Sequence, residues 1–298
     1  MGDTAREVAS AIAATRLSEA TRAIWASAPP EPSPGQVWRA RWESSALLVL
    51  LIEVQRATVL ACPITSDVAG SNSSAFVVPE TRSSLQTPLV TWVELRRQLP
   101  VRVLDRCLGE MQSEVVEAVA ANTHDERLPR GRLAVHGTDP SLQEQARLED
   151  RLDELAAAAW APVGIGGLKD LFDATGVSLA QVRQLPGVPD GDALSVRRGD
   201  RPLDAPQIEA LVARTGVTAD RWWEANPQLP EALIAALDRP AARAKVVALA
   251  AEERRSEIAA WRSVAYDVFS LAARQTGEAT EPNWEGRLGQ YFAGRGLT

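Results

Sequence analysis

The stretch Gln36-Val-Trp-Arg-Ala-Arg-Trp42 marks the point at which the sequence becomes β-rich. Trp38, Ala40 and Trp42 share one face of an extended chain and the intervening arginines share the other, as in a half-buried strand. Further short β-rich runs follow at residues 46–54, 58–64, 75–78 and 89–95. Five or six short strands within about 65 residues predict a small barrel or a strongly bent sheet.

The segment before this sheet is predicted to be a helix followed by an arm. Thr4 and Glu7 have the spacing of a capping box, and a loosely helical apolar stripe extends to Trp25. The run from Ala28 to Gly35 contains four prolines, which cannot continue a helix. Residues 1–33 are therefore assigned to an N-terminal helix and a proline-rich arm.

The segment after the sheet predicts two helices and a boundary. Residues 109–121 are expected to form a closing helix, with Met111, Val115 and Val119 on one face. We assign residues 34–122 to the barrel. Residues 122–140 are polar and punctuated by proline and glycine, so we place the domain boundary there or just after it. Residues 123–163 are interpreted as a linker and a connecting helix from Ser141 to Trp160.

The remainder of the chain is predicted to be helical, which makes the whole an α+β protein. Four short helices are expected at residues 168–175, 178–185, 190–197 and 205–215, separated by glycines. We assign residues 164–226 to one helical domain and residues 227–298 to C-terminal helices. A longer helix is expected after Pro240, with Gly277 as its stop, followed by a short aromatic segment around Trp284.

Composition excludes several classes of protein. No run of eighteen apolar residues occurs, so no membrane-spanning helix is expected, and the first thirty residues lack a signal-peptide pattern, which favours a cytoplasmic location. The net charge of −7 argues against nonspecific coating of nucleic acid. Cys62 and Cys107 are interpreted as small buried side chains, and His124 and His136 as solvated ones. No metal site and no cofactor are expected.

The segment from Leu168 to Val217 resembles the Cro/C1 (Xre) helix-turn-helix family. The matching features are Ser178 at the start of the second helix, the Arg197-Arg-Gly199 turn, and an Ala-Arg-Thr-Gly-Val close. The resemblance implies that the third helix enters the major groove of DNA. The side chains that it makes available for phosphates and bases are Gln181, Arg183, Ser195, Arg197, Arg198 and Arg201.

The charge of this segment leaves a second interpretation open. The third helix is expected to begin near Pro189 and to include Asp190 and Asp192, whose carboxylates would be repelled by phosphates. Residues 164–225 hold seven basic and nine acidic side chains, so the domain lacks an overall basic surface. The alternative is a compact helical bundle that keeps the fold for protein contacts.

The first half resembles the MazF/PemK toxin family, through Pro34-Gly-Gln-Val-Trp38 and Pro63-Ile-Thr-Ser66, with residues 104–109 as the closing strand. The resemblance implies an SH3-like barrel that cuts single-stranded RNA, with Thr65 and Ser66 near the scissile phosphate. The family's arginine-proline pair is replaced by Ala46-Leu47. Arg39, Arg41 or Arg56 would have to supply the missing cation.

Three functional hypotheses follow. The first is a toxin–antitoxin-like regulator that binds DNA through its helical half and uses a non-catalytic barrel to bind a protein partner or to form a homodimer. The second is an endoribonuclease toxin fused to its own regulatory domain, with RNA as substrate. The third is a non-enzymatic interaction scaffold, in which the N-terminal helix and Trp222-Trp223 mediate contacts.

Overall fold

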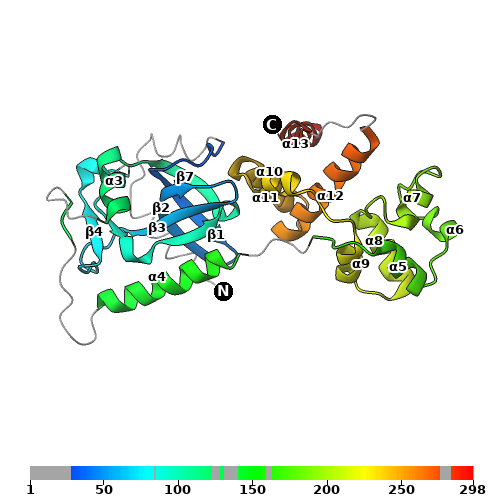
Figure 1. Cartoon of the computed structure of the whole chain (residues 1–298), viewed down its shortest axis with the longest axis horizontal. Helices are drawn as coiled ribbons and strands as arrows, with labels where there is room; N and C mark the ends of the chain where they lie inside the picture. Colours follow the sequence, from blue (N-terminus) through cyan, green and yellow to red (C-terminus); the bar gives the residue numbers. More distant parts are fainter. Residues whose placement is uncertain are drawn as a thin grey trace. The chain divides into compact units, whose positions relative to one another are not determined.

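A computed structural model of the chain describes residues 28–83, 85–122, 128–130, 140–158, 163–275 and 283–297. It is a mixed α+β protein, with an antiparallel sheet in the first half and helices in the second (Figure 1). The chain forms two compact units. Unit 1 comprises residues 1–158 and 238–244, and unit 2 comprises residues 159–237 and 245–298. The predicted N-terminal helix, both histidines and Gly277 lie outside the described residues.

The described part of unit 1 contains a seven-stranded antiparallel sheet. Its strands follow the order β4-β5-β3-β2-β1-β7, and β6 also pairs with β3. The strand bounds are β1 (Gln36–Trp42), β2 (Ser45–Val54), β3 (Thr58–Thr65), β4 (Ala75–Val78), β5 (Leu89–Trp92), β6 (Arg97–Pro100) and β7 (Leu104–Glu110). The predicted strands at residues 36–42, 46–54, 58–64 and 75–78 are therefore confirmed.

The predicted strand at residues 89–95 is interrupted by a bend. Strand β5 ends at Trp92, and Val93–Leu95 form a 3-10 turn before β6 begins. Strand β5 pairs with the end of β3, whereas β6 pairs with its beginning, so the bent segment follows one edge of β3. Strand β6 lacks a clear sequence signal because Leu99 alone among its four residues is buried.

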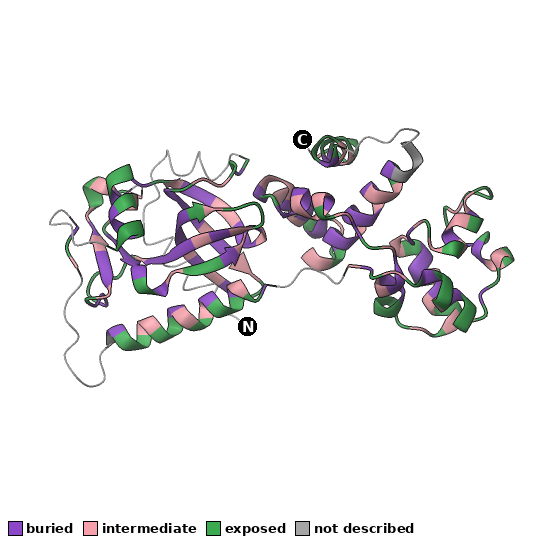
Figure 2. Cartoon of the chain, in the orientation of Figure 1, coloured by how far each residue is buried: buried purple, intermediate pink, exposed green. Residues whose placement is uncertain are grey.

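The sheet is buried on both faces. The register pairs Trp38 with Val49 and Arg39 with Leu48, so alternate side chains of β1 and β2 enter different apolar clusters. One cluster includes Trp38 and Val49. The other includes Leu50 and is covered by helix α3 (Ser113–Ala121). Helix α3 starts four residues later than predicted because Gly109 and Glu110 extend β7. Buried and exposed residues are distinguished in Figure 2.

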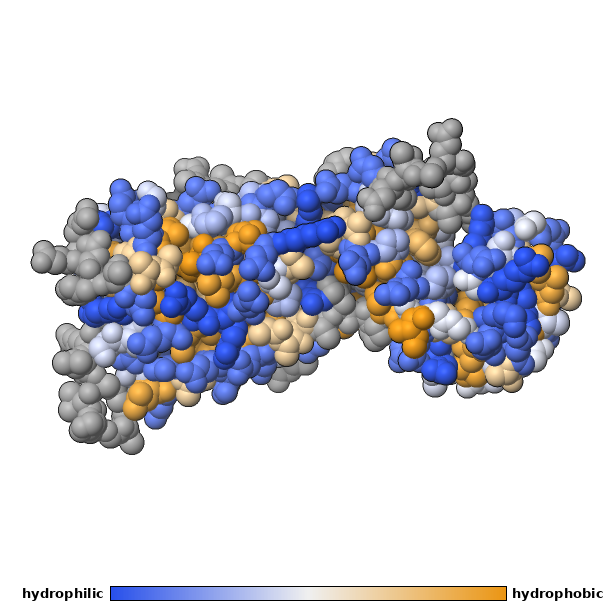
Figure 3. All heavy atoms as spheres, viewed as in Figure 1, coloured by the Kyte–Doolittle hydropathy of each residue, from blue (hydrophilic) through white to orange (hydrophobic). Residues whose placement is uncertain are grey.

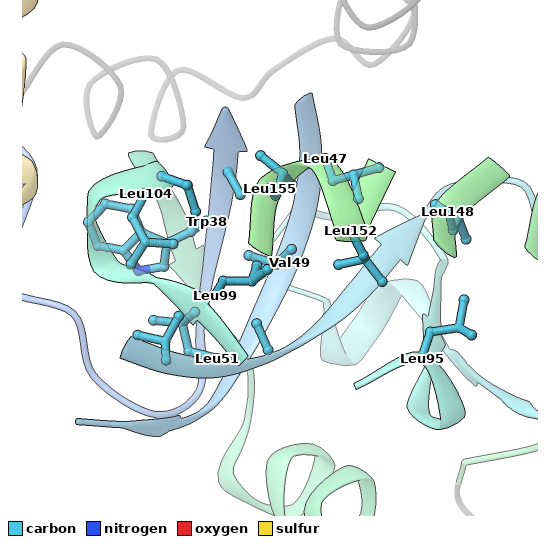
Figure 4. Packing of buried hydrophobic residues seen from close by; sticks show 14 of the residues in the cluster. Trp38, Leu47, Val49, Leu51, Leu95, Leu99, Leu104, Leu148, Leu152 and Leu155 are labelled. Atoms are coloured by element: carbon cyan, nitrogen blue, oxygen red, sulfur yellow. The ribbon is translucent and has the colours of Figure 1, made fainter. Parts of the chain in front are cut away.

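Helix α4 (Pro140–Ala156) covers the face of the sheet that carries Trp38. Leu148, Leu152 and Leu155, spaced four and three residues apart, are buried in the same cluster as Trp38 (Figure 4). Arg97 Nη2 on β6 also lies 2.6 Å from Asp153 Oδ1. The segment interpreted as a connecting helix is therefore part of unit 1, because its apolar stripe completes the core.

The described helices of unit 2 mostly follow the predicted ranges. Their bounds are α5 (Leu168–Ala174), α6 (Leu179–Val182), α7 (Ala193–Arg198), α8 (Ala205–Thr215), α9 (Ala219–Ala225), α12 (Glu257–Gln275) and α13 (Trp284–Gly294), while α10 (Glu231–Asp238) and α11 (Pro240–Glu252) contribute residues to both units. The single helix predicted after Pro240 is divided, because Arg254 has a positive φ of 55° and Ser256 begins a new helix. No described helix has the length and apolar character needed to span a membrane.

Candidate nucleic-acid interface

Helices α5 to α9 pack around a buried aromatic pair. The ring centroids of Phe172 and Trp222 are 5.3 Å apart. The next residue, Trp223, has its ring centroid 5.5 Å from that of Tyr266. Both tryptophans are buried, at 0% and 8% exposure. They are therefore core residues of unit 2, and the scaffold hypothesis loses the surface contact assigned to Trp222-Trp223.

Two capping boxes fix the starts of α6 and α8. Ser178 Oγ accepts a hydrogen bond from the Gln181 backbone N–H, and Gln181 Oε1 accepts one from the Ser178 backbone N–H. Asp204 and Gln207 form the same reciprocal pair at α8. Ser178 thus opens the second helix as expected. The Gln181 side chain, a candidate for DNA contact, is instead used to begin its own helix.

Helix α7 begins at Ala193, whereas the sequence predicts a start near Pro189. The backbone N–H of Asp192 donates to the Pro189 carbonyl at 2.9 Å, so residues 189–192 form a turn. Asp190 and Gly191 consequently lie outside the helix. The carboxylates expected to line α7 lie in the turn before it, which removes one objection to an approach by phosphates.

Arg197 is held inside unit 2. Its Nε donates to the Val177 carbonyl at 3.1 Å, its Nη2 donates to Asp173 Oδ1 at 2.5 Å, and its guanidinium carbon lies 5.4 Å from the Phe172 ring centroid. These contacts tie the end of α7 to α5. Lys169 and Arg197 both hydrogen-bond Asp173 and lower the pKa of its carboxyl to about 2. Arg197 therefore positions α7.

Arg201 is also engaged, through an ion pair with Asp192. This pair joins the residue before α7 to the segment that follows it. Of the six candidate DNA contacts, Gln181, Arg197 and Arg201 therefore serve the internal structure of unit 2. The sequence gives no signal for the partners of the two arginines, because Asp173 lies 24 residues from Arg197 and Asp192 lies nine residues from Arg201 across a turn and a short helix.

The other three candidates remain available on the surface. Arg183 and Arg198 are exposed and Ser195 is half-buried. Among the described residues, none of these three side chains forms a hydrogen bond or an ion pair. Leu194, which is 46% exposed, precedes Arg198 by four residues and so shares its face of α7. Hydrophilic and apolar side chains are interspersed on the face of unit 2 in view in Figure 3.

In unit 1, Thr65 lies at the end of β3 and Ser66 is exposed just after it. Thr65 Oγ1 accepts a hydrogen bond from Trp92 Nε1 at 3.1 Å. Trp92 is fully buried in the cluster covered by α4. The described contact of Thr65 therefore satisfies a buried indole N–H, which is a structural role.

The arginines that would have to complete a ribonuclease site lie elsewhere. Arg39 pairs across the sheet with Leu48, which pairs with Ile64, so these side chains share the face opposite to Thr65. Both Arg39 and Arg41 form ion pairs with Asp105. Arg56 lies in the turn that precedes β3, at the end of this strand opposite to Thr65.

The two cysteines are buried, as expected from the sequence. Burial raises the pKa of the Cys62 thiol to about 12 and also raises the pKa of Cys107. Neither thiol is therefore suited to nucleophilic chemistry. Within the described ranges, no group of three His, Cys, Asp or Glu side chains is arranged to hold a metal ion.

Comparison of the sequence with protein-family models finds no match, and comparison with curated proteins finds none either. The positions of the side chains therefore carry the functional inference. Of the six candidate DNA contacts, Arg183, Ser195 and Arg198 are the ones that the described contacts leave available for a partner.

Proposed function

We propose that unit 2 binds DNA through α7 and that the protein is a toxin–antitoxin-like regulator. Helices α5 to α8 would form an Xre-like helix-turn-helix domain. Helix α7 would enter the major groove, with Arg183 and Arg198 contacting phosphates and Ser195 close to base edges. The observation that carries the proposal is the difference between two adjacent arginines of α7. Arg197 is bound inside the domain, whereas Arg198 is exposed.

Three features of α7 support this proposal. Its start at Ala193 moves Asp190 out of the helix, and Arg201 neutralises Asp192. Leu194, exposed beside Arg198, offers an apolar contact of the kind that thymine methyl groups accept. The domain remains acidic overall, so we expect affinity to depend on a few phosphate contacts.

We propose that unit 1 is a non-catalytic SH3-like barrel that binds a protein partner or a second copy of the chain. The support is that Arg39 and Arg41 lie on the face opposite to Thr65 and are bound to Asp105. Phosphoryl transfer from RNA requires a cation near the reacting phosphate. The described arrangement of Thr65 provides a hydrogen bond to Trp92 instead.

A mobility-shift assay tests the DNA-binding proposal. DNA from the promoter of the chain's own gene is the natural probe, with a scrambled duplex of equal length as the control. We expect preferential binding to the promoter and a loss of affinity as salt concentration rises. Equal affinity for both duplexes, or no binding at low salt, would overturn the proposal.

A further inference from the structure

Leu194 is the exposed apolar side chain of α7. It is the second residue of this helix and is 46% exposed, although leucine is among the residue types that folded proteins most often bury. The other apolar side chains of the helix, Ala193 and Val196, are buried in unit 2. The outward face of α7 therefore presents Leu194 next to Ser195, with Arg198 one turn further along.

Contacts at both ends of α7 hold this face in position. The helix ends at Gly199, which adopts a left-handed backbone conformation with a φ of 81°. Arg197 connects the last turn to α5, and Arg201 forms an ion pair with Asp192, directly before the first turn. None of these contacts involves the side chain of Leu194. The orientation of the helix is therefore set independently of this leucine, which is presented on a fixed element.

The charge of this face is complementary to that of DNA. Helix α7 contains no acidic residue, and its last turn carries Arg197 and Arg198. The carboxylate directly before the helix, that of Asp192, is paired with Arg201. An apolar side chain one turn away from an exposed cation matches the major groove, where base edges lie between the phosphates of the two strands.

Thymine is the base that offers an apolar group in the major groove. Its C5 methyl group lies at the groove edge, whereas the other three bases are distinguished there by their hydrogen-bond donors and acceptors. The side chain of Leu194 has neither a donor nor an acceptor, so it can select a base only through an apolar contact. Burial of one methyl group corresponds to about a fourfold change in affinity.

We propose that Leu194 packs against a thymine methyl group and is a specificity-determining residue of unit 2, which selects an A·T base pair at this position. Ser195, whose hydroxyl group both donates and accepts hydrogen bonds, is the neighbouring polar contact, and Arg198 binds the flanking phosphate. The inference rests on the proposed function, and it adds to that function the base pair that α7 recognises.

Fluorescence anisotropy of the full chain with two versions of its own promoter DNA tests the contact. One duplex contains thymidine, and the other has deoxyuridine at every thymidine position, which removes the methyl groups and keeps the base pairing. We expect the unaltered chain to bind the uracil duplex about fourfold more weakly. Leu194→Ala should distinguish the two duplexes by less than about twofold, because most of the apolar contact area is removed.

Leu271→Ala is the matched control, because Leu271 on α12 is 44% exposed and undergoes the same chemical change. This variant should distinguish the two duplexes as well as the unaltered chain does. The inference is overturned, with DNA binding retained, if the unaltered chain binds both duplexes equally or if Leu194→Ala keeps the full preference for thymine. Absence of binding to the thymine duplex at low salt overturns the proposed function and this inference together.

Discussion

Arg197 Nη2 lies 2.5 Å from Asp173 Oδ1, and this ion pair connects the end of α7 to α5. The neighbouring residue, Arg198, is exposed. Two adjacent arginines, which the sequence presents as equivalent candidates for DNA contact, thus have different roles. Arg197 holds α7 in place, whereas Arg198 is exposed and, among the described residues, forms no hydrogen bond or ion pair.

We expect Arg197→Ala to destabilise the protein by about 1–2 kcal/mol, because it removes a hydrogen bond to the Val177 carbonyl and the packing of the guanidinium on Phe172. Arg198→Ala should change stability by less than about 0.5 kcal/mol, as is usual for an exposed side chain. Urea unfolding measures both. Equal stability of the two variants would contradict the structural role of Arg197.

The Asp173 carboxyl gives a pH dependence with a definite sign. Hydrogen bonds from Lys169 and then Arg197 lower its pKa from 3.8 to about 2. A depressed pKa in the folded state means that the contribution of Asp173 is present above about pH 4 and is lost as the pH falls through about 2. The difference in melting temperature between the unaltered chain and Asp173→Asn should therefore shrink between pH 4 and pH 2. A difference that stays constant would contradict this assignment.

Thr65→Val should destabilise unit 1 by about 1–3 kcal/mol, because it leaves the buried Trp92 N–H without an acceptor. Thr65→Ser keeps the hydroxyl and serves as the control, with a smaller loss. Thermal unfolding of the full chain measures the order of the three proteins. Equal stability of the valine and serine variants would show that the hydrogen bond contributes nothing.

The same variants test the absence of catalysis in unit 1. Long single-stranded RNA should stay intact with the unaltered chain, because Arg39 and Arg41 lie on the face of the sheet opposite to Thr65 and are paired with Asp105. Site-specific cleavage that is lost in Thr65→Val and kept in Thr65→Ser would contradict this expectation, and it would restore the endoribonuclease hypothesis.

Leu152→Ala should destabilise unit 1 by about 2–5 kcal/mol, because Leu152 is fully buried between α4 and the sheet. Leu142→Ala makes the same chemical change on the same helix at a residue that is 50% exposed, and it should cost less than about 1 kcal/mol. Chemical denaturation measures both. If the two losses are equal, α4 does not complete the core.

The sequence predicts the regular parts of the fold because their signals are local. The alternation around Trp38 places β1 and its two faces, and the spacing of Ser178 and Gln181 places the start of α6. The sequence does not predict which element a helix packs against when that element is distant along the chain. The stripe of α4, including Leu152, shows an amphipathic helix but does not show that the sheet is what it covers.

The candidate site follows the same rule. The sequence indicates that Arg197 and Arg198 are both suited to bind phosphates. Their roles differ because Arg197 alone is paired with Asp173, which lies 24 residues before it. The start of α7 also depends on a turn closed by the Pro189 carbonyl. Periodicity does not reveal this turn, so the prediction that Asp190 lies in the helix is wrong. A cavity beside α7 is lined both by Asp192 and by Asp267 on α12, which are 75 residues apart, so it has no sequence signal.

DNA binding by α7 is tested by the affinity of Arg198→Ala for promoter DNA, measured by fluorescence anisotropy at several salt concentrations. We expect Arg198→Ala to weaken binding and to lower the salt slope by about one, because one phosphate contact is lost. Arg214→Ala, an exposed arginine on α8 outside the proposed interface, should bind like the unaltered chain. If Arg198→Ala and Arg214→Ala bind with the same affinity and the same salt slope, α7 is not the DNA-binding helix.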